Sequence, residues 1–218
     1  MYSKDYSLGK TIKKLLITHN LEAPMLNKQI DSWHDPVFLH TLTTKFSEFL
    51  TLLGFDLTNH SLEETPKRVI KFFITELFYG LDYHNFPKIT LDANSFHYQE
   101  PLFAQNISIN STCEHHLVSI HGIANFAYIP HEHIIGLSKI NRVIDFFAKR
   151  PQLQERLTRQ IFFTFQEILK TNNIAIVIKA THDCIAIRGI KDVNTYNTTS
   201  HISGEFLTNV ELKNQLFK

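Results

Sequence analysis

The residues best suited to chemistry fall in two short segments, Cys113-Glu114-His115-His116 and His182-Asp183-Cys184. The only two cysteines of the chain are divided between these segments. Two thiolates and one imidazole form a donor set that is typical of a catalytic zinc site with a fourth position left for water. The spacing leaves three alternatives open, namely a four-ligand structural zinc site, one disulfide, or a buried thiol beside surface histidines.

Three ligands would complete an open zinc site, so two of the histidines would remain beside the metal as general acids and bases. The apolar run Ile174-Ala175-Ile176-Val177-Ile178 predicts a buried strand that leads into the second segment. If the chain stays extended, its alternation places His182, Cys184 and Arg188 on one face.

No glycine-rich phosphate loop is present, and the chain has seven glycines in all. Any phosphate must therefore be held by side chains. Lys139 and Arg142 fall in the first turn of a helix that we expect Ser138 to cap, where the helix dipole favours anions. Arg188 is a further candidate, although each of these cations is also consistent with an ordinary solvated side chain.

Gln154-Glu155 falls near the start of a long predicted helix. A glutamate in the first turn is commonly a favourable partner of the helix dipole. The functional interpretation is a carboxylate that accepts two N–H groups from a guanine edge and so discriminates against adenine.

The elements that would position these residues follow from hydrophobic periodicity and cap residues. Helices are predicted from Leu8 to Thr18, from Asp35-Pro36 to Gly54, from Thr65-Pro66 to Gly80, from Ser138 to Arg150-Pro151, and from Leu153 to Asn172-Asn173. Strands are predicted over 107–111, 124–129 and 174–178. This order indicates an α+β fold with an antiparallel sheet, divided into an N-terminal helical region (1–95) and a catalytic domain (96–218).

Charge and hydropathy restrict the partners. The 22 basic and 21 acidic residues give a net charge of +1, without the basic excess of a nucleic-acid-binding protein. No apolar run approaches the roughly 18 residues of a membrane span, and the polar N-terminus lacks a signal-peptide pattern. We therefore expect a cytoplasmic, reduced protein with no nucleic-acid or membrane partner.

Several segments resemble the signature segments of the GTP cyclohydrolase I family, in order and with matching spacing from about Phe46 to Phe206. They are Glu64-Thr65-Pro66-Lys67-Arg68, Gly80-Leu81-Asp82-Tyr83, Ser111-Thr112-Cys113-Glu114-His115-His116, Gly136-Leu137-Ser138-Lys139-Ile140-Asn141-Arg142, Arg150-Pro151-Gln152-Leu153-Gln154-Glu155-Arg156-Leu157-Thr158, and His182-Asp183-Cys184 with Arg188-Gly189. The first 45 residues match poorly.

The resemblance implies the tunnelling fold, in which a four-stranded antiparallel sheet carries two long helices on one side, here preceded by an N-terminal helical extension. It also implies a homo-oligomer, a decamer of two pentamers with active sites at subunit interfaces. The implied cofactor is Zn²⁺, held by Cys113, His116 and Cys184.

The resemblance also implies roles for the other candidates. His115 and His182 become the acid–base pair, and Ser138 assists at the ribose. Glu155 grips the guanine with Gln154 beside it. The triphosphate is held by four cations, the last from a neighbouring subunit: Lys139, Arg142, Arg188 and Arg68.

The implied reaction opens the purine ring of GTP by hydrolysis, releases formate and gives 7,8-dihydroneopterin triphosphate, the first step of folate or related pterin synthesis. One alternative is a non-catalytic, zinc-containing regulator that binds a guanine nucleotide. A second is a tunnelling-fold enzyme that acts on another purine or pterin.

Overall fold

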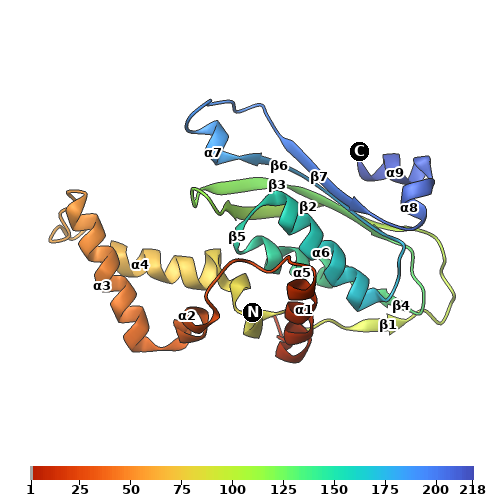
Figure 1. The fold of residues 1–218 in the computed structure, drawn as a ribbon, viewed down its shortest axis with the longest axis horizontal. Helices are drawn as coiled ribbons and strands as arrows, with labels where there is room; N and C mark the ends of the chain where they lie inside the picture. Colours follow the sequence, from red (N-terminus) through yellow and green to blue (C-terminus); the bar gives the residue numbers. More distant parts are fainter. Residues whose placement is uncertain (1) are drawn as a thin grey trace.

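The computed structural model describes residues 2–218 and consists of helices and two β-sheets (Figure 1). The helices are α1 (Tyr6–Thr18), α2 (Asn27–Asp31), α3 (Pro36–Leu52), α4 (Thr65–Phe72), α5 (Leu137–Ala148), α6 (Gln154–Leu169), α7 (Asp183–Ala186), α8 (Glu205–Thr208) and α9 (Val210–Leu216). Short 3-10 or π-helical turns are η1 (Ser32–His34), η2 (Phe73–Leu77), η3 (Tyr79–Leu81) and η4 (Tyr83–Asn85). The strands are β1 (Leu91–Ala93), β2 (Leu102–Cys113), β3 (Ser119–Tyr128), β4 (His133–Ile135), β5 (Pro151–Gln152), β6 (Ile174–His182) and β7 (Asn197–Ile202).

The larger sheet has the strand order β5-β2-β3-β6-β7. Its four longer strands are antiparallel, as expected, and the two-residue strand β5 adds a parallel pairing with the end of β2. Strands β1 and β4 form a separate two-stranded sheet. The mixed α+β class predicted from the order of elements is therefore confirmed.

Helices α5 and α6 cover one face of the larger sheet, and α8 and α9 lie against the other (Figure 1). The alternation of β6 explains why its sequence is apolar throughout. Ile174, Ile176 and Ile178 point into the main core beneath α6, whereas Ala175 and Val177 face Phe206 and Leu216 of the C-terminal helices. A strand buried on both faces needs a continuous hydrophobic run.

The N-terminal helices divide into two groups. Helix α1 packs Ile12 and Leu16 into the main core, and both side chains are fully buried. Helices α3 and α4 pack together and extend away from the sheet as an arm (Figure 1). Asp35 caps α3 through its side chain, which accepts from the Val37 amide, and Gly54 follows the helix with φ +92, both as predicted.

Several element boundaries were predicted wrongly. Ser138 does not cap α5, because the helix begins at Leu137 with Gly136 as N-cap. Thr65 is the first residue of α4, after Glu64, and the regular helix ends at Phe72, where the π-helical turn η2 takes over. Helix α6 ends at Leu169 instead of near Asn172, because Lys170 adopts the left-handed conformation that terminates helices.

The register of the sheet brings the two reactive segments to one edge. Thr112 pairs with Ser119 across the β2–β3 hairpin, and Ile120 pairs with His182 at the end of β6. The turn after Cys113 and the residues after His182 therefore leave the sheet side by side. Among residues 2–218, no helix has both the length and the apolar character needed to cross a lipid bilayer.

Candidate active site

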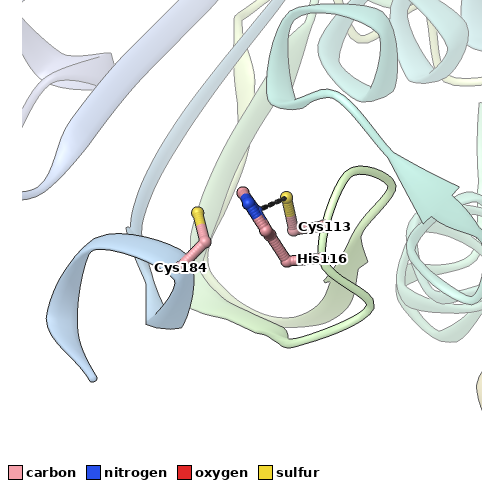
Figure 2. Close-up of side chains that lie close together, drawn as sticks. All are labelled: Cys113, His116 and Cys184. Atoms are coloured by element: carbon pink, nitrogen blue, oxygen red, sulfur yellow. Dashed lines mark hydrogen bonds between the residues drawn. The ribbon is translucent and has the colours of Figure 1, made fainter. Parts of the chain in front are cut away.

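Cys113, His116 and Cys184 converge at this edge of the sheet (Figure 2). Their donor atoms all lie within 4.8 Å of one another, and the Cys113 thiol lies 4.0 Å from Nδ1 of His116. Both cysteines are free thiols. One ion can therefore contact two sulfur atoms and one imidazole nitrogen, the donor set that suits zinc.

The turn after β2 places His116 next to Cys113. The Cys113 amide donates to the Val118 carbonyl at 2.8 Å, and the Leu117 amide donates to the Cys113 carbonyl at 2.9 Å. Leu117 closes the turn with a positive φ of 54°. These backbone contacts fold the four-residue segment back on itself, so both ligand side chains face the same space.

Cys184 reaches the same space by a different route from the one predicted. Strand β6 ends at His182, and Asp183 begins the short helix α7. The expectation that His182, Cys184 and Arg188 share one face of a continuous strand is therefore wrong. A helical residue advances by about 100° around the axis, so the period of two no longer applies after Asp183.

The two thiols affect each other's protonation. Burial raises the pKa of the Cys184 thiol, the neighbouring Cys113 adds to this increase, and Arg188 opposes it. Two thiolates held this close repel each other, and a divalent cation offsets that repulsion. The residues present thus fit a bound zinc ion chemically as well as geometrically.

His182 is held by Gln154, the first residue of α6. Its Nε2 lies 2.8 Å from Oε1 of Gln154. The Gln154 amide nitrogen lies 3.1 Å from the carbonyl oxygens of Ile178 and Asn197, which can only accept, so Oε1 must face the histidine. The neutral His182 ring therefore carries its hydrogen on Nε2 and leaves Nδ1 as the basic nitrogen.

Burial lowers the pKa of His182, and the nearby Glu155 carboxylate opposes this shift. Glu155 itself is exposed, one residue after the buried Gln154. His115 is also open to solvent, with 63% of its side chain exposed. His182 and Glu155 thus lie near each other at the junction of β6 and α6, and His115 lies in the same turn as two of the metal ligands.

The predicted cations lie in three different places. Arg188 follows α7, and its Nη1 lies 2.7 Å from Nε2 of His116. Arg142 belongs to α5, where its guanidinium lies 5.0 Å from the centre of the Tyr2 ring. Arg68 lies on α4 in the helical arm. Only Arg188 of these three adjoins the cysteines within one chain.

Ser138 and Lys139 lie at the opposite end of α5 from the metal ligands. The carboxyl end of this helix adjoins β2, because the Ser111 hydroxyl donates to the Ala148 carbonyl at 2.7 Å. Ser138 is ten residues earlier, which is about 15 Å along the helix axis. One chain therefore does not bring these two residues to its own cysteines.

A cavity of about 840 Å³ opens elsewhere, between the helical arm and the η3–η4 segment, and its lining includes Trp33, His34, Lys71 and Asp82. None of the predicted site residues lines this cavity.

Sequence reasoning placed Gln154 near the substrate but missed its contact with His182. It also missed the pairing of Arg156 with Glu114 inside the ligand turn. These contacts join residues 28 and 42 positions apart, and no local period signals them. In the amino-acid sequence, a glutamine or an arginine at the start of a helix gives no sign of whether its side chain will be buried or solvated.

The chain is similar to known proteins over most of its length. The family model for GTP cyclohydrolase I matches residues 42–218. Among curated proteins, the chain is similar to "GTP cyclohydrolase 1" of Mannheimia succiniciproducens, with 46% identity over 95% of this chain and 94% of that protein. It is also similar to the proteins of the same name from Pasteurella multocida (44% identity, 95% and 94% coverage) and Yersinia enterocolitica (42%, 96% and 94%). The chain belongs to the GTP cyclohydrolase I family.

Proposed function

We propose that this chain catalyses the hydrolytic opening of the purine ring of GTP, releasing formate and giving 7,8-dihydroneopterin triphosphate for folate or related pterin synthesis. Membership of the family supports this activity. The observation that carries it is the convergence of Cys113, His116 and Cys184 with histidines left over beside them.

We propose zinc as the cofactor, held by Cys113, His116 and Cys184. When bound, zinc supplies a Lewis acid that makes water acidic enough to react near neutral pH. A three-ligand set leaves room for water, as in other catalytic zinc sites.

The other residues at this edge would have the roles that the family resemblance implies. His182, oriented by Gln154, exchanges a proton with the purine ring through Nδ1. His115, in the turn next to the ligands, serves as the second acid or base. Glu155 accepts hydrogen bonds from the guanine edge, and its exposure in the single chain leaves its carboxylate available.

The remaining site residues support an active site shared between subunits. Ser138, Lys139 and Arg142 lie toward the far end of α5, and Arg68 lies on the helical arm. We propose that these residues meet the cysteines of a neighbouring subunit, where Ser138 assists at the ribose. Four cations would then hold the triphosphate, namely Lys139, Arg142, Arg68 and Arg188.

This arrangement requires a homo-oligomer, and we propose the decamer of two pentamers built on the tunnelling fold. Residues 1–95 would form the helical extension and residues 96–218 the catalytic domain. A cytoplasmic location is part of the proposal, because a reduced compartment keeps both thiols available to the metal.

The test combines metal analysis with product detection. The purified protein should contain about one zinc per chain, release formate from GTP and yield a fluorescent pterin after oxidation. Cys113→Ser and Cys184→Ser should lose zinc and activity together. Tight GTP binding without formate would instead support the non-catalytic regulator, and turnover of another purine would support a different substrate.

A further inference from the structure

Arg156 forms an ion pair with Glu114, which directly follows the ligand Cys113 and comes two residues before the ligand His116. The Arg156 side chain is 13% exposed and the Glu114 side chain 17% exposed. Screening by water is weak at such exposure, and removal of either partner leaves the other charge without compensation. The pair is therefore a strong restraint on the position of the turn.

Arg156 is itself fixed by further hydrogen bonds. Its Nε donates to Oε1 of Gln152 at 3.2 Å, and its Nη2 donates to the Pro151 carbonyl at 3.2 Å. The Gln152 amide in turn donates to the Phe147 carbonyl and to Oε1 of Gln160, both at 2.8 Å. The guanidinium is thus anchored to β5, to the end of α5 and to the second turn of α6.

The same strand β5 holds the turn through its backbone. Gln152 pairs with Cys113 in the parallel register, and the Glu114 amide donates to the Gln152 carbonyl at 3.1 Å. Glu114 is therefore restrained at its main chain by β5 and at its side chain by Arg156. These restraints lie immediately after one ligand and two residues before the next.

The second oxygen of the Glu114 carboxylate faces the candidate acid–base residue. Oε1 lies 3.9 Å from Nε2 of His115, while Oε2 contacts Arg156. This separation is too long for a hydrogen bond, so the carboxylate acts on the His115 ring only through its charge.

We propose that Arg156 is a positioning residue of the metal centre, acting through Glu114 to hold Cys113 and His116 in the geometry that retains the ion. The inference rests on the proposed metal site, but it concerns retention of the metal and not the reaction. Residues that orient metal ligands typically change metal affinity by about 10- to 100-fold when they are replaced.

The test measures zinc release from the full-length, zinc-loaded protein to a colorimetric chelator in excess. Arg156→Met and Glu114→Gln should each speed release by about 10- to 100-fold. The double variant should release zinc no faster than the faster single variant, because both changes remove one interaction. Arg156→Lys, which keeps the charge but not the planar fork, should restore part of the retention.

Arg159→Met is the matched control, since Arg159 lies on the same helix with its guanidinium 5.7 Å from the Phe163 ring centre. Its zinc release should equal that of the wild type. Visible spectra of the cobalt-substituted proteins supply a second readout, and the ligand-field bands should shift in Arg156→Met and Glu114→Gln but not in Arg159→Met.

Unchanged release in Glu114→Gln, which is isosteric and the variant best able to fold, would overturn the inference. A double variant whose increase in the zinc-release rate equals the product of the two single increases would also overturn it. A wild-type protein that retains zinc in this Arg156-dependent way but releases no formate would overturn the proposed function alone. If the wild type is active but Arg156→Met releases zinc at the wild-type rate, this inference alone would be overturned.

Discussion

The amide of Gln154 holds Nε2 of His182 at 2.8 Å, joining the first residue of α6 to the last residue of β6. Gln154 is buried, and its amide nitrogen is directed at main-chain oxygens of two neighbouring strands. The orientation of the histidine is therefore built into the junction of helix and sheet. Gln154, whose side chain is hydrogen-bonded to the sheet, therefore determines that Nδ1 is the nitrogen of His182 left free to accept a proton.

The first prediction concerns this contact. Gln154→Met removes the acceptor for Nε2, so His182 loses its fixed tautomer and its orientation. Turnover should fall by about 10- to 100-fold, as expected for a misplaced reacting group. The zinc content should not change. The ¹⁵N shifts of His182 should show mixed tautomers, while Gln166→Met, at a half-buried glutamine near the other end of the same helix, should leave both turnover and shifts as in the wild type.

The second prediction separates the two adjacent histidines. His116 lies with the thiols and His115 does not, so His115→Ala should keep the metal while turnover falls by about 10²- to 10⁴-fold, the usual contribution of a general acid or base. His116→Ala should lose both the metal and the activity. Elemental analysis and a formate assay on the same samples check this, and loss of metal from His115→Ala would mean that the ligand assignment is wrong.

The third prediction concerns the sheet register that positions His182. A Cβ added at Gly122 of β3 would come within 2.2 Å of the Lys179 carbonyl oxygen and within 2.6 Å of Ala180. Both neighbours belong to β6, where backbone cannot move without disturbing the ladder. Gly122→Ala should therefore lower the free energy of unfolding by about 1–3 kcal/mol, the usual cost of overpacking.

Urea denaturation gives this free energy. The control is Gly136→Ala, where the nearest atom to an added Cβ is 3.9 Å away. Because Gly136 is the N-cap of α5, this variant should lose only the preference for glycine over alanine at a cap, and it should be more stable than Gly122→Ala. Equal stability of both variants would show that β3 and β6 can separate locally to accept a methyl group.

The fourth prediction is a pH dependence at Asp82, which His34 and His84 flank at 2.9 and 2.8 Å. Burial acts to raise the pKa of this carboxyl, but hydrogen bonds from the His84 amide and from both imidazoles outweigh it and lower the pKa overall. A carboxylate with a lowered pKa stabilises the fold above its ordinary pKa of 3.8 and loses that contribution as the pH falls through its folded value.

Asp82→Asn should therefore lower stability at pH 7 by about 1–3 kcal/mol, because the imidazole donors lose their charged acceptor. The difference from the wild type should shrink as the pH falls below about 4. Denaturation curves across this range check the sign, with Asp92→Asn on the exposed strand β1 as control. A difference that stays constant from pH 7 to pH 3 would contradict the prediction.

Local signals in the sequence predicted much of the framework. Asp35-Pro36 carries its cap chemistry within two residues, and the uninterrupted apolar run from Ile174 to Ile178 has no place except between two covered faces of a sheet. Ser138 was wrongly placed as a cap because several neighbouring residues can begin a helix, and packing selects one of them.

The amino-acid sequence by itself determined that two cysteines and three histidines were available in two segments, and its resemblance to a family assigned them roles. Only the tertiary structure decided that His116 faces both thiols, that Cys184 reaches them from a helix, and that Gln154 fixes His182. Propensities and caps act within a few residues of the chain. The distances among these side chains depend on strand register and helix docking, which bring together residues far apart in the sequence.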